Sequence, residues 1–177
     1  TRNNEVLRLV PRYNEEVNSY WMCDHGRLNT FKFINAGDRV DGPHMRVEGN
    51  LINVGWDEAF AKAASSLKAF GKDEIAVLGS AYATVEDNFV AAKFARSVLG
   101  TGHLDFIRHI NSSFGDDILK NEDVTPNSKG AELVGVKPSK NGFDFNGIIK
   151  LIREGKIKAL YVLEDDILND NPELENV

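Results

Sequence analysis

The chain has 177 residues, a formal net charge of −6 and 42% hydrophobic residues, which is enough for one well-cored domain with a small appendage. The acidic balance argues against a nucleic-acid binder, because such proteins usually carry a basic stripe. No apolar run reaches the roughly 20 residues that a membrane-spanning helix needs, and a single cysteine excludes an internal disulfide.

The amino-terminal part is expected to be a small β-rich segment. Val6–Val10 alternates apolar and basic residues, which predicts a strand that Pro11 ends. Residues 12–30 keep no lasting period and are expected to form a loop. Residues 39–54 are expected to form a short β region, in which residues 45–48 alternate, Gly49-Asn50 makes a turn and residues 51–54 return.

A helix and a buried strand are expected next. Apolar residues recur at helical spacing from Phe60 to Phe70, with acids at positions 57 and 58 and a stop at Gly71. The unbroken apolar run Ile75–Gly79 is typical of a buried parallel strand. Thr84 is the expected N-cap of a second helix, which should be buried on more than one side and end at Gly100.

The last elements complete an α/β pattern. A third helix is expected to open at Asp144 or Asn146 and to end at Gly155, followed by a second buried strand over Lys158–Leu163. Strand and helix alternate, so the fold class is α/β with a parallel sheet. The irregular stretch 107–143 is long for a compact domain, and such stretches are usually functional or flexible.

The only cysteine, Cys23, lies in a setting that is unusual for a structural cysteine. Trp21 precedes it by two residues, and an Asp-x-Gly-Arg sequence follows it directly. A glycine that allows close approach and a nearby arginine are typical of iron–sulfur ligand surroundings. One cysteine cannot hold a four-iron cluster. Either Cys23 is an ordinary thiol, or its partner ligands lie outside this chain.

These residues carry a resemblance. The run from Val6 to Arg12 and the Trp-Met-Cys-Asp-x-Gly-Arg run ending at Arg27 look like the close of the iron–sulfur segment in the molybdopterin oxidoreductase superfamily. Within it, they are most similar to the G chains of bacterial NADH:quinone oxidoreductase (respiratory complex I). The order and spacing of later stretches strengthen the resemblance; these stretches are residues 56–59, 84–88, 99–101, 104–105 and 155–163.

The resemblance implies a fragment with two parts. Residues 1–54 would be the carboxyl-terminal part of a 4Fe-4S segment, and residues 55–177 the first part of a Rossmann-like α/β domain. Cys23 would be the fourth ligand of a 4Fe-4S cluster, with Trp21 and Arg27 shaping its surroundings. The first three cysteines would then lie just before Thr1. No catalytic residue and no cofactor-binding residue is expected within the fragment itself.

The sequence departs from the cofactor-binding relatives at two places, and bound molybdopterin is therefore not expected. The second predicted strand runs into Glu164-Asp165-Asp166, where many of those relatives have a glycine with Asn-Pro. A carboxylate about 6 Å from a pyrophosphate charge is repelled by roughly 2–3 kcal/mol at an effective dielectric constant near 20. In addition, the segment that would carry the metal ligand, Arg108–Asn111, contains no cysteine.

Three hypotheses follow. The first is part of an iron–sulfur electron-transfer subunit of NADH:quinone oxidoreductase, whose α/β part is a scaffold without molybdopterin. Its partners would be other subunits of a respiratory complex, and its location would be cytoplasmic, peripheral to the membrane through those partners. The second is part of an active molybdenum or tungsten oxidoreductase such as a formate dehydrogenase. The third is a stand-alone binding domain with an ordinary thiol at Cys23.

Overall fold

The computed structural model describes residues 1–118, 120–170 and 172. The chain forms two compact units, residues 1–59 and residues 60–177. Within the described part, no helix is both long enough and apolar enough to cross a membrane.

The first unit contains one helix and one hairpin, α1 (Asp24–Ile34), β1 (His44–Val47) and β2 (Asn50–Asn53). The hairpin confirms the predicted pair of strands, but its turn is formed by Glu48 and Gly49 and not, as predicted, by Gly49 and Asn50. β1 and β2 are antiparallel, and Val47 lies opposite Asn50 across a two-residue turn. Both turn residues, Glu48 and Gly49, have positive φ angles of 49° and 84°, as expected of a type I′ turn, whose twist matches that of the flanking strands.

Two predictions for this unit were wrong. Val6–Val10 forms no strand in the described chain; instead the Asn35 side chain bonds both backbone groups of Val6, accepting from its N–H at 3.0 Å and donating to its carbonyl at 2.8 Å. Residues 12–30 are not all loop, because α1 begins at Asp24. The acid at that position favours a helix start, since it lies at the positive end of the helix dipole.

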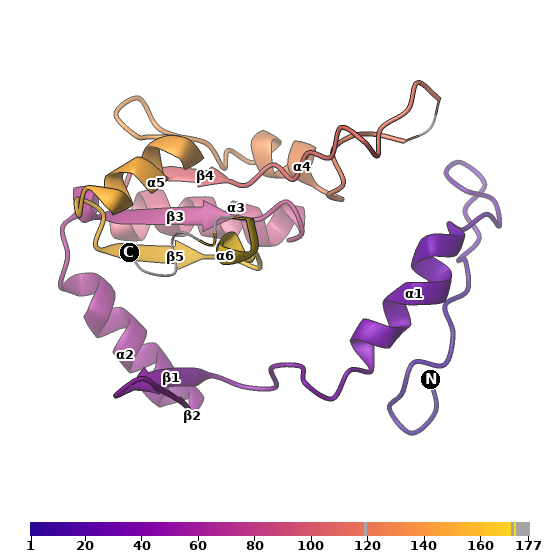
Figure 1. The fold of residues 1–177 in the computed structure, drawn as a ribbon, viewed down its shortest axis with the longest axis horizontal. Helices are drawn as coiled ribbons and strands as arrows, with labels where there is room; N and C mark the ends of the chain where they lie inside the picture. The colour runs from indigo at the N-terminus through magenta and orange to yellow at the C-terminus, as the bar shows by residue number, and fades with distance from the viewer. Residues whose placement is uncertain (119, 171, 173–177) are drawn as a thin grey trace. The chain divides into compact units, whose positions relative to one another are not determined.

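The second unit is a parallel α/β arrangement (Figure 1). A helix that begins in the first unit, α2 (Trp56–Lys68), leads into it. The elements that follow are η1 (Lys72–Glu74), β3 (Ile75–Gly79), α3 (Val85–Lys93), the π-helical turn η2 (Phe94–Leu99), β4 (Leu104–Phe106), α4 (Ser128–Leu133), α5 (Phe145–Arg153), β5 (Ala159–Val162) and α6 (Ile167–Asp170). The three strands are parallel in the order β4-β3-β5, so β3 lies in the centre.

Helices cover both faces of this sheet, and successive side chains of β3 pack against helices on opposite faces. Val77 packs with residues of α3, η2 and α4, whereas Ala76 and Leu78 pack with Ile148 of α5. A strand covered on both sides needs apolar residues at every position, and all five residues of β3 are buried. The predicted buried strand is therefore confirmed, and it forms the centre of the core.

The predicted helix starts are confirmed by their caps. Thr84 Oγ1 accepts a hydrogen bond from the N–H of Asp87 at 3.1 Å, and the carboxylate of Asp144 accepts from the N–H of Gly147 at 2.9 Å. Each cap satisfies a backbone donor that a helix leaves without an internal partner. The helix formed by α3 and η2 ends as predicted at Gly100, which has a left-handed φ of 72°.

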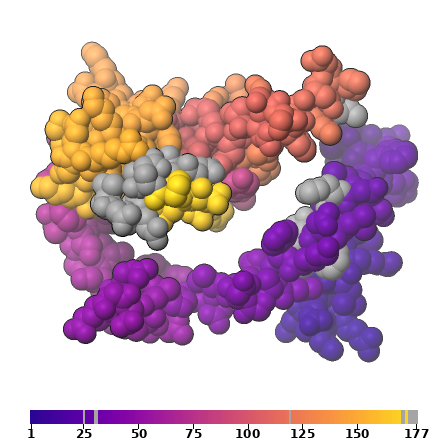
Figure 2. Space-filling model, viewed as in Figure 1, coloured from indigo at the N-terminus to yellow at the C-terminus, as the bar shows by residue number. Residues whose placement is uncertain are grey.

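Other expectations need correction. The helix formed by α3 and η2 is buried on one side only. Its buried face consists of small residues, whereas Val90 and Val98 are 62% and 70% exposed. β5 is only half-buried, since it is an edge strand. The irregular stretch 107–143 contains α4, and β4 just before it was not predicted. Figure 2 shows the part of this stretch after β4, in salmon, projecting from the body of the unit.

Candidate functional site

Cys23 lies at the amino-terminal end of α1. Its carbonyl oxygen accepts a hydrogen bond from the N–H of Arg27 at 3.1 Å, the first bond of the helix, and its side chain is exposed. The guanidinium of Arg27 lies 2.5 Å from the carboxylate of Asp24, and Trp21 is 84% exposed. The Trp-x-Cys-Asp-x-Gly-Arg residues therefore form a helix start with an accessible thiol.

These residues fit an iron–sulfur cluster only in part. The sequence contains a single cysteine, so it can supply one of the four thiolates that a four-iron cluster normally takes. Among the described residues, no three His, Cys, Asp or Glu side chains lie close enough to hold a metal ion. The assignment of Cys23 as a cluster ligand stays a prediction.

A second candidate site lies where the strands of the second unit end. The segments after β4 and β5 meet there, because His109 Nε2 lies 3.1 Å and 3.2 Å from the two carboxylate oxygens of Asp165. The ring of Tyr82, which follows β3, lies 5.2 Å from the His109 ring. The two residues lie in the stretches Arg108–Asn111 and Glu164–Asp166, and no local pattern pairs residues 56 positions apart.

The loops after β3 and β5 are also joined. Ser80 is fully buried, and its hydroxyl donates to the carbonyl of Glu164 at 2.9 Å and accepts from the N–H of Tyr82 at 3.0 Å. Glu164 has a left-handed φ of 44°, which is uncommon for a residue with a side chain. Two segments 84 residues apart are thus held together by a buried hydroxyl.

The run Glu164-Asp165-Asp166 suggested three carboxylates that would repel a pyrophosphate alike. In the structure the three side chains have different environments. The Asp165 side chain is only 2% exposed and is bonded to His109. The Asp166 carboxylate caps α6, accepting from the N–H groups of Leu168 and Asn169 at 3.1 Å and 3.2 Å. Glu164 alone of the three side chains is exposed without a described hydrogen bond to its carboxylate. Counting all three carboxylates as free therefore overestimates the electrostatic repulsion of a pyrophosphate at this edge.

This edge nevertheless does not fit a dinucleotide pyrophosphate. Such a group binds to backbone N–H groups at a helix amino terminus or to cations. Here the first turn of α3 carries Glu86 and Asp87 and is capped by Thr84. The nearby Arg108 already contacts Asp105 at 3.5 Å and Glu132 at 3.3 Å. The donors at this edge are bonded to protein groups, and carboxylates surround them.

Asp123 adds a further negative charge near His109. Burial would raise its pKa, but hydrogen bonds from Ser128 and Thr125, together with the charge of His109, hold the pKa of Asp123 below its usual value. The carboxylate is therefore ionised at neutral pH. This additional negative charge near the His109–Asp165 pair would repel a phosphate group.

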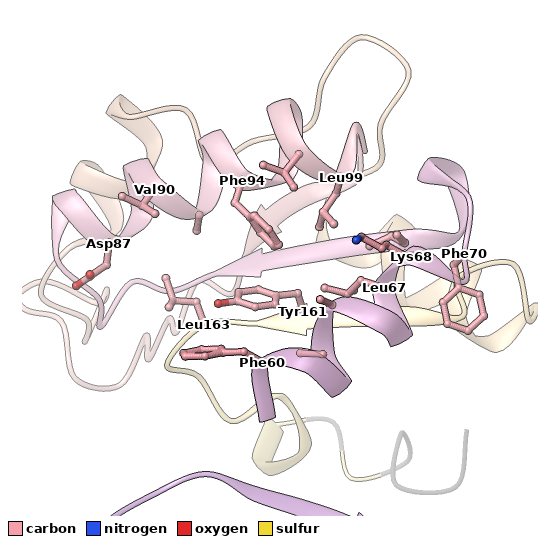
Figure 3. Close-up of a pocket in the computed structure, with 15 residues that line it drawn as sticks. Phe60, Leu67, Lys68, Phe70, Asp87, Val90, Phe94, Leu99, Tyr161 and Leu163 are labelled. Carbon is pink, nitrogen blue, oxygen red and sulfur yellow. The ribbon is translucent and has the colours of Figure 1, made fainter. Parts of the chain in front are cut away.

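An apolar groove of about 800 Å³ lies in the second unit. Figure 3 shows Phe94 and Leu99 on one side of Tyr161, and Phe60 and Leu67 of α2 on the other. The Phe94 and Tyr161 rings are 5.5 Å apart. Asp87 and Lys68 lie toward opposite ends of the groove (Figure 3). Exposed apolar surface of this kind often marks an interaction site.

The comparisons with known proteins match both units. Residues 39–141 match the molybdopterin oxidoreductase family, and residues 1–30 match the NADH-ubiquinone oxidoreductase NDSU1/NuoG-like 4Fe-4S domain. Similar curated proteins include the G chain of the NADH-quinone oxidoreductase of Streptomyces coelicolor, 36% identical over 67% of this chain. Subunit 3 of the same type of enzyme from Thermus thermophilus is 36% identical over 60% of the chain.

A formate dehydrogenase is also similar. The F420-dependent formate dehydrogenase subunit alpha of Methanocaldococcus jannaschii is 30% identical over 63% of this chain. The chain spans only 14%, 13% and 16% of the lengths of these three relatives, in the order given. The family match covers more than half of the present chain. The chain therefore belongs to the molybdopterin oxidoreductase family.

Proposed function

We propose that this chain is part of an iron–sulfur electron-transfer subunit of the NADH-quinone oxidoreductase type. In the whole protein Cys23 is one ligand of a 4Fe-4S cluster, with Trp21 and Arg27 close to it. The 4Fe-4S domain match over residues 1–30 supports this role, because it includes all three residues. An iron–sulfur cluster transfers electrons without a general acid or base, and its thiolates serve as ligands, so no catalytic side chain is expected in this chain.

The α/β part, residues 55–177, is a Rossmann-like scaffold that holds no molybdopterin, and residues 1–54 belong to the iron–sulfur segment. One observation carries this proposal: the His109–Asp165 and Ser80–Glu164 bonds close the edge of the sheet where a dinucleotide would bind. The match to the molybdopterin oxidoreductase family identifies the family of the fold. The side chains at the carboxyl ends of the strands favour a scaffold role over cofactor binding.

The partners are other subunits of a respiratory complex, which would place the protein in the cytoplasm at the membrane surface. Relatives are named as subunits of NADH-quinone oxidoreductase, and the apolar groove along Phe94 and Tyr161 offers a surface for such contacts. Charge at both ends of the groove, from Asp87 and Lys68, would orient a neighbouring polypeptide.

Metal analysis of the whole protein purified from its native cells tests this function. The expected result is iron and acid-labile sulfide, with no molybdenum, no tungsten and no extractable pterin. About one molybdenum or tungsten atom per chain would overturn the scaffold assignment. Absence of iron would overturn the electron-transfer assignment and return Cys23 to an ordinary thiol.

The alternative function is an active molybdenum or tungsten oxidoreductase such as a formate dehydrogenase. The similarity to the Methanocaldococcus jannaschii enzyme favours it. It requires the bonds at Ser80 and His109 to open for a pyrophosphate, and formate-dependent reduction of an artificial acceptor by the whole protein would establish it.

A further inference from the structure

The strand order defines where a ligand would bind this sheet. β3 is central, β4 lies on one side, and the chain then returns to place β5 on the other side. In open parallel sheets, ligands bind outside the carboxyl ends of the strands where connections lead off to opposite sides. In this chain that point lies between β3 and β5, at the loops that contain Ser80 and Glu164.

Protein groups bridge this point. The backbone carbonyl of Leu78 accepts from the N–H of Leu163 at 2.9 Å, which continues the ladder past the end of β5. The next bridge is the bond from the Ser80 hydroxyl to Glu164. Beyond it, His109 reaches Asp165 from the segment after β4. The loops after all three strands are thereby connected.

The His109–Asp165 bond is part-buried, and its carboxylate end is almost fully shielded from solvent. The Asp165 side chain is 2% exposed and the His109 side chain 14%. A buried carboxylate is unfavourable unless donors replace the water that it has lost. Asp165 receives one bond from His109 and one from the N–H of Asp166 at 2.9 Å. In the tautomer with a hydrogen on Nε2, the His109 ring is the donor of this bond and the Asp165 side chain the acceptor.

We infer that His109 and Asp165 form a lock that takes the place of a ligand at this point of the sheet. The lock rests on the proposed cofactor-free function. In a cofactor-binding protein the ligand itself can hold the loops of neighbouring strands together. Here a histidine after β4 and an aspartate after β5 do so, and both are positioning residues for residues 107–110 and 163–166.

Two substitutions of His109 separate a hydrogen bond from simple packing. His109→Gln retains an N–H donor, whereas His109→Phe retains a ring beside Tyr82 but loses the donor. Asp165→Asn removes the charge from the other partner. The matched control is the exposed pair Glu154–Lys156, whose atoms lie 2.7 Å apart, neutralised by Lys156→Gln.

Amide hydrogen exchange of the folded chain is the measurement. His109→Phe and Asp165→Asn should each speed exchange about tenfold in both segments, residues 107–110 and 163–166, because the first removes the donor of the bond and the second replaces its carboxylate by a weaker amide acceptor. His109→Gln should restore most of the protection, and Lys156→Gln should leave both segments unchanged. Combining His109→Phe with Asp165→Asn should add little to either alone.

Several outcomes would overturn the lock. These are faster exchange in the substituted segment only, protection retained by His109→Phe but lost in His109→Gln, or independent effects that multiply in the double variant. Should the Asp165 variant not fold, the wild-type chain still decides: the two segments must open with one common free energy, and unequal values refute the coupling.

Titration of the wild-type chain with inorganic pyrophosphate separates this inference from the proposed function. Absence of binding is expected, and binding with displacement of the His109–Asp165 bond would overturn the lock and the cofactor-free scaffold together. With no binding but uncoupled loops, the lock fails while the scaffold function stands.

Discussion

Asn88 bonds both backbone groups of Ser80 and so closes the turn between β3 and α3. Its side-chain oxygen accepts from the N–H of Ser80 at 3.1 Å, and its side-chain nitrogen donates to the carbonyl of Ser80 at 2.8 Å. Both residues are fully buried. An asparagine thus replaces the neighbouring strand that would otherwise satisfy these groups, and it holds Ser80 where its hydroxyl reaches Glu164.

Replacing Asn88 by Ala should lower the free energy of unfolding by about 2–3 kcal/mol, because the buried N–H of Ser80 loses its acceptor and the Ser80 carbonyl keeps only the bond from the N–H of Ala83. Urea unfolding followed by circular dichroism measures the loss. Asn146→Ala, at an exposed asparagine in the first turn of α5, is the control and should change stability by less than about 0.5 kcal/mol. Equal effects of the two substitutions would contradict the role given to Asn88.

Gly79 should tolerate no side chain. A Cβ atom there would lie 2.7 Å from Val136 Cγ1 and 2.8 Å from Asn88 Oδ1, so Gly79→Ala should destabilise the chain by about 1–3 kcal/mol through overpacking. The control is Gly71→Ala, where the added Cβ would make only an ordinary contact of 3.5 Å. Thermal unfolding of both variants distinguishes a clash from a general effect of losing a glycine, which would shift both equally.

His103 should make stability depend on pH. It is 6% exposed, its Nδ1 has no hydrogen-bond partner among the described residues, and its ring stacks on Phe143. Burial lowers the pKa of His103, although the charge of Asp73 opposes the shift. In the unfolded chain a histidine takes up a proton near pH 6.5, so the unfolded state binds more protons below that pH. Stability should therefore fall as the pH drops through about 6.5.

The variant His103→Phe isolates this effect, because phenylalanine keeps a ring beside Phe143 and takes up no proton. Urea unfolding at pH 7.5 and pH 5.5 should show a smaller loss of stability on acidification for the variant than for the wild type. Comparing the two proteins cancels the contribution of the carboxylates. Identical losses would mean that His103 takes up its proton equally in the folded and unfolded states, so that its burial does not shift its pKa.

Cys23→Ser, made in the whole protein, should remove or cripple one four-iron centre and leave the α/β unit folded, because Cys23 is exposed and lies in the other compact unit. Electron paramagnetic resonance of the reduced protein should lose one signal, while circular dichroism stays unchanged. The present chain by itself should hold no cluster in a defined state. Identical spectra and iron content in variant and wild type would make Cys23 an ordinary thiol.

Val98→Asp tests the apolar groove as a subunit contact. Val98 lines the groove and is 70% exposed, so the folded chain should lose less than about 0.5 kcal/mol of stability. A charge in an apolar interface should, however, weaken assembly at least about tenfold. Co-purification of the whole protein with its partner subunits measures this. Ser97→Asp, exposed and outside the groove lining, is the matched control and should assemble normally.

The sequence alone determined the elements whose signals are local. Thr84 and Asp144 mark helix starts because a cap bonds a backbone group only three residues away. Gly100 marks a helix end because it accepts a left-handed conformation. The unbroken run Ile75–Gly79 indicated a buried strand because both faces of a central parallel strand are covered. The motif around Cys23 likewise indicated the family from neighbouring residues.

Contacts between residues far apart in the chain depend on the tertiary structure. β4 is three residues long and too short to show a period, so its place beside β3 emerges only from pairing. His109 and Asp165 are 56 positions apart, and their contact depends on the return of the chain that places β5 beyond β3. Burial also depends on tertiary packing. The apolar pattern of the helix after Thr84 predicted burial on more than one side, yet small residues alone form its packed face because it lies close against the sheet. Local propensity depends on a few neighbouring residues, whereas strand order and burial depend on the packing of the whole unit.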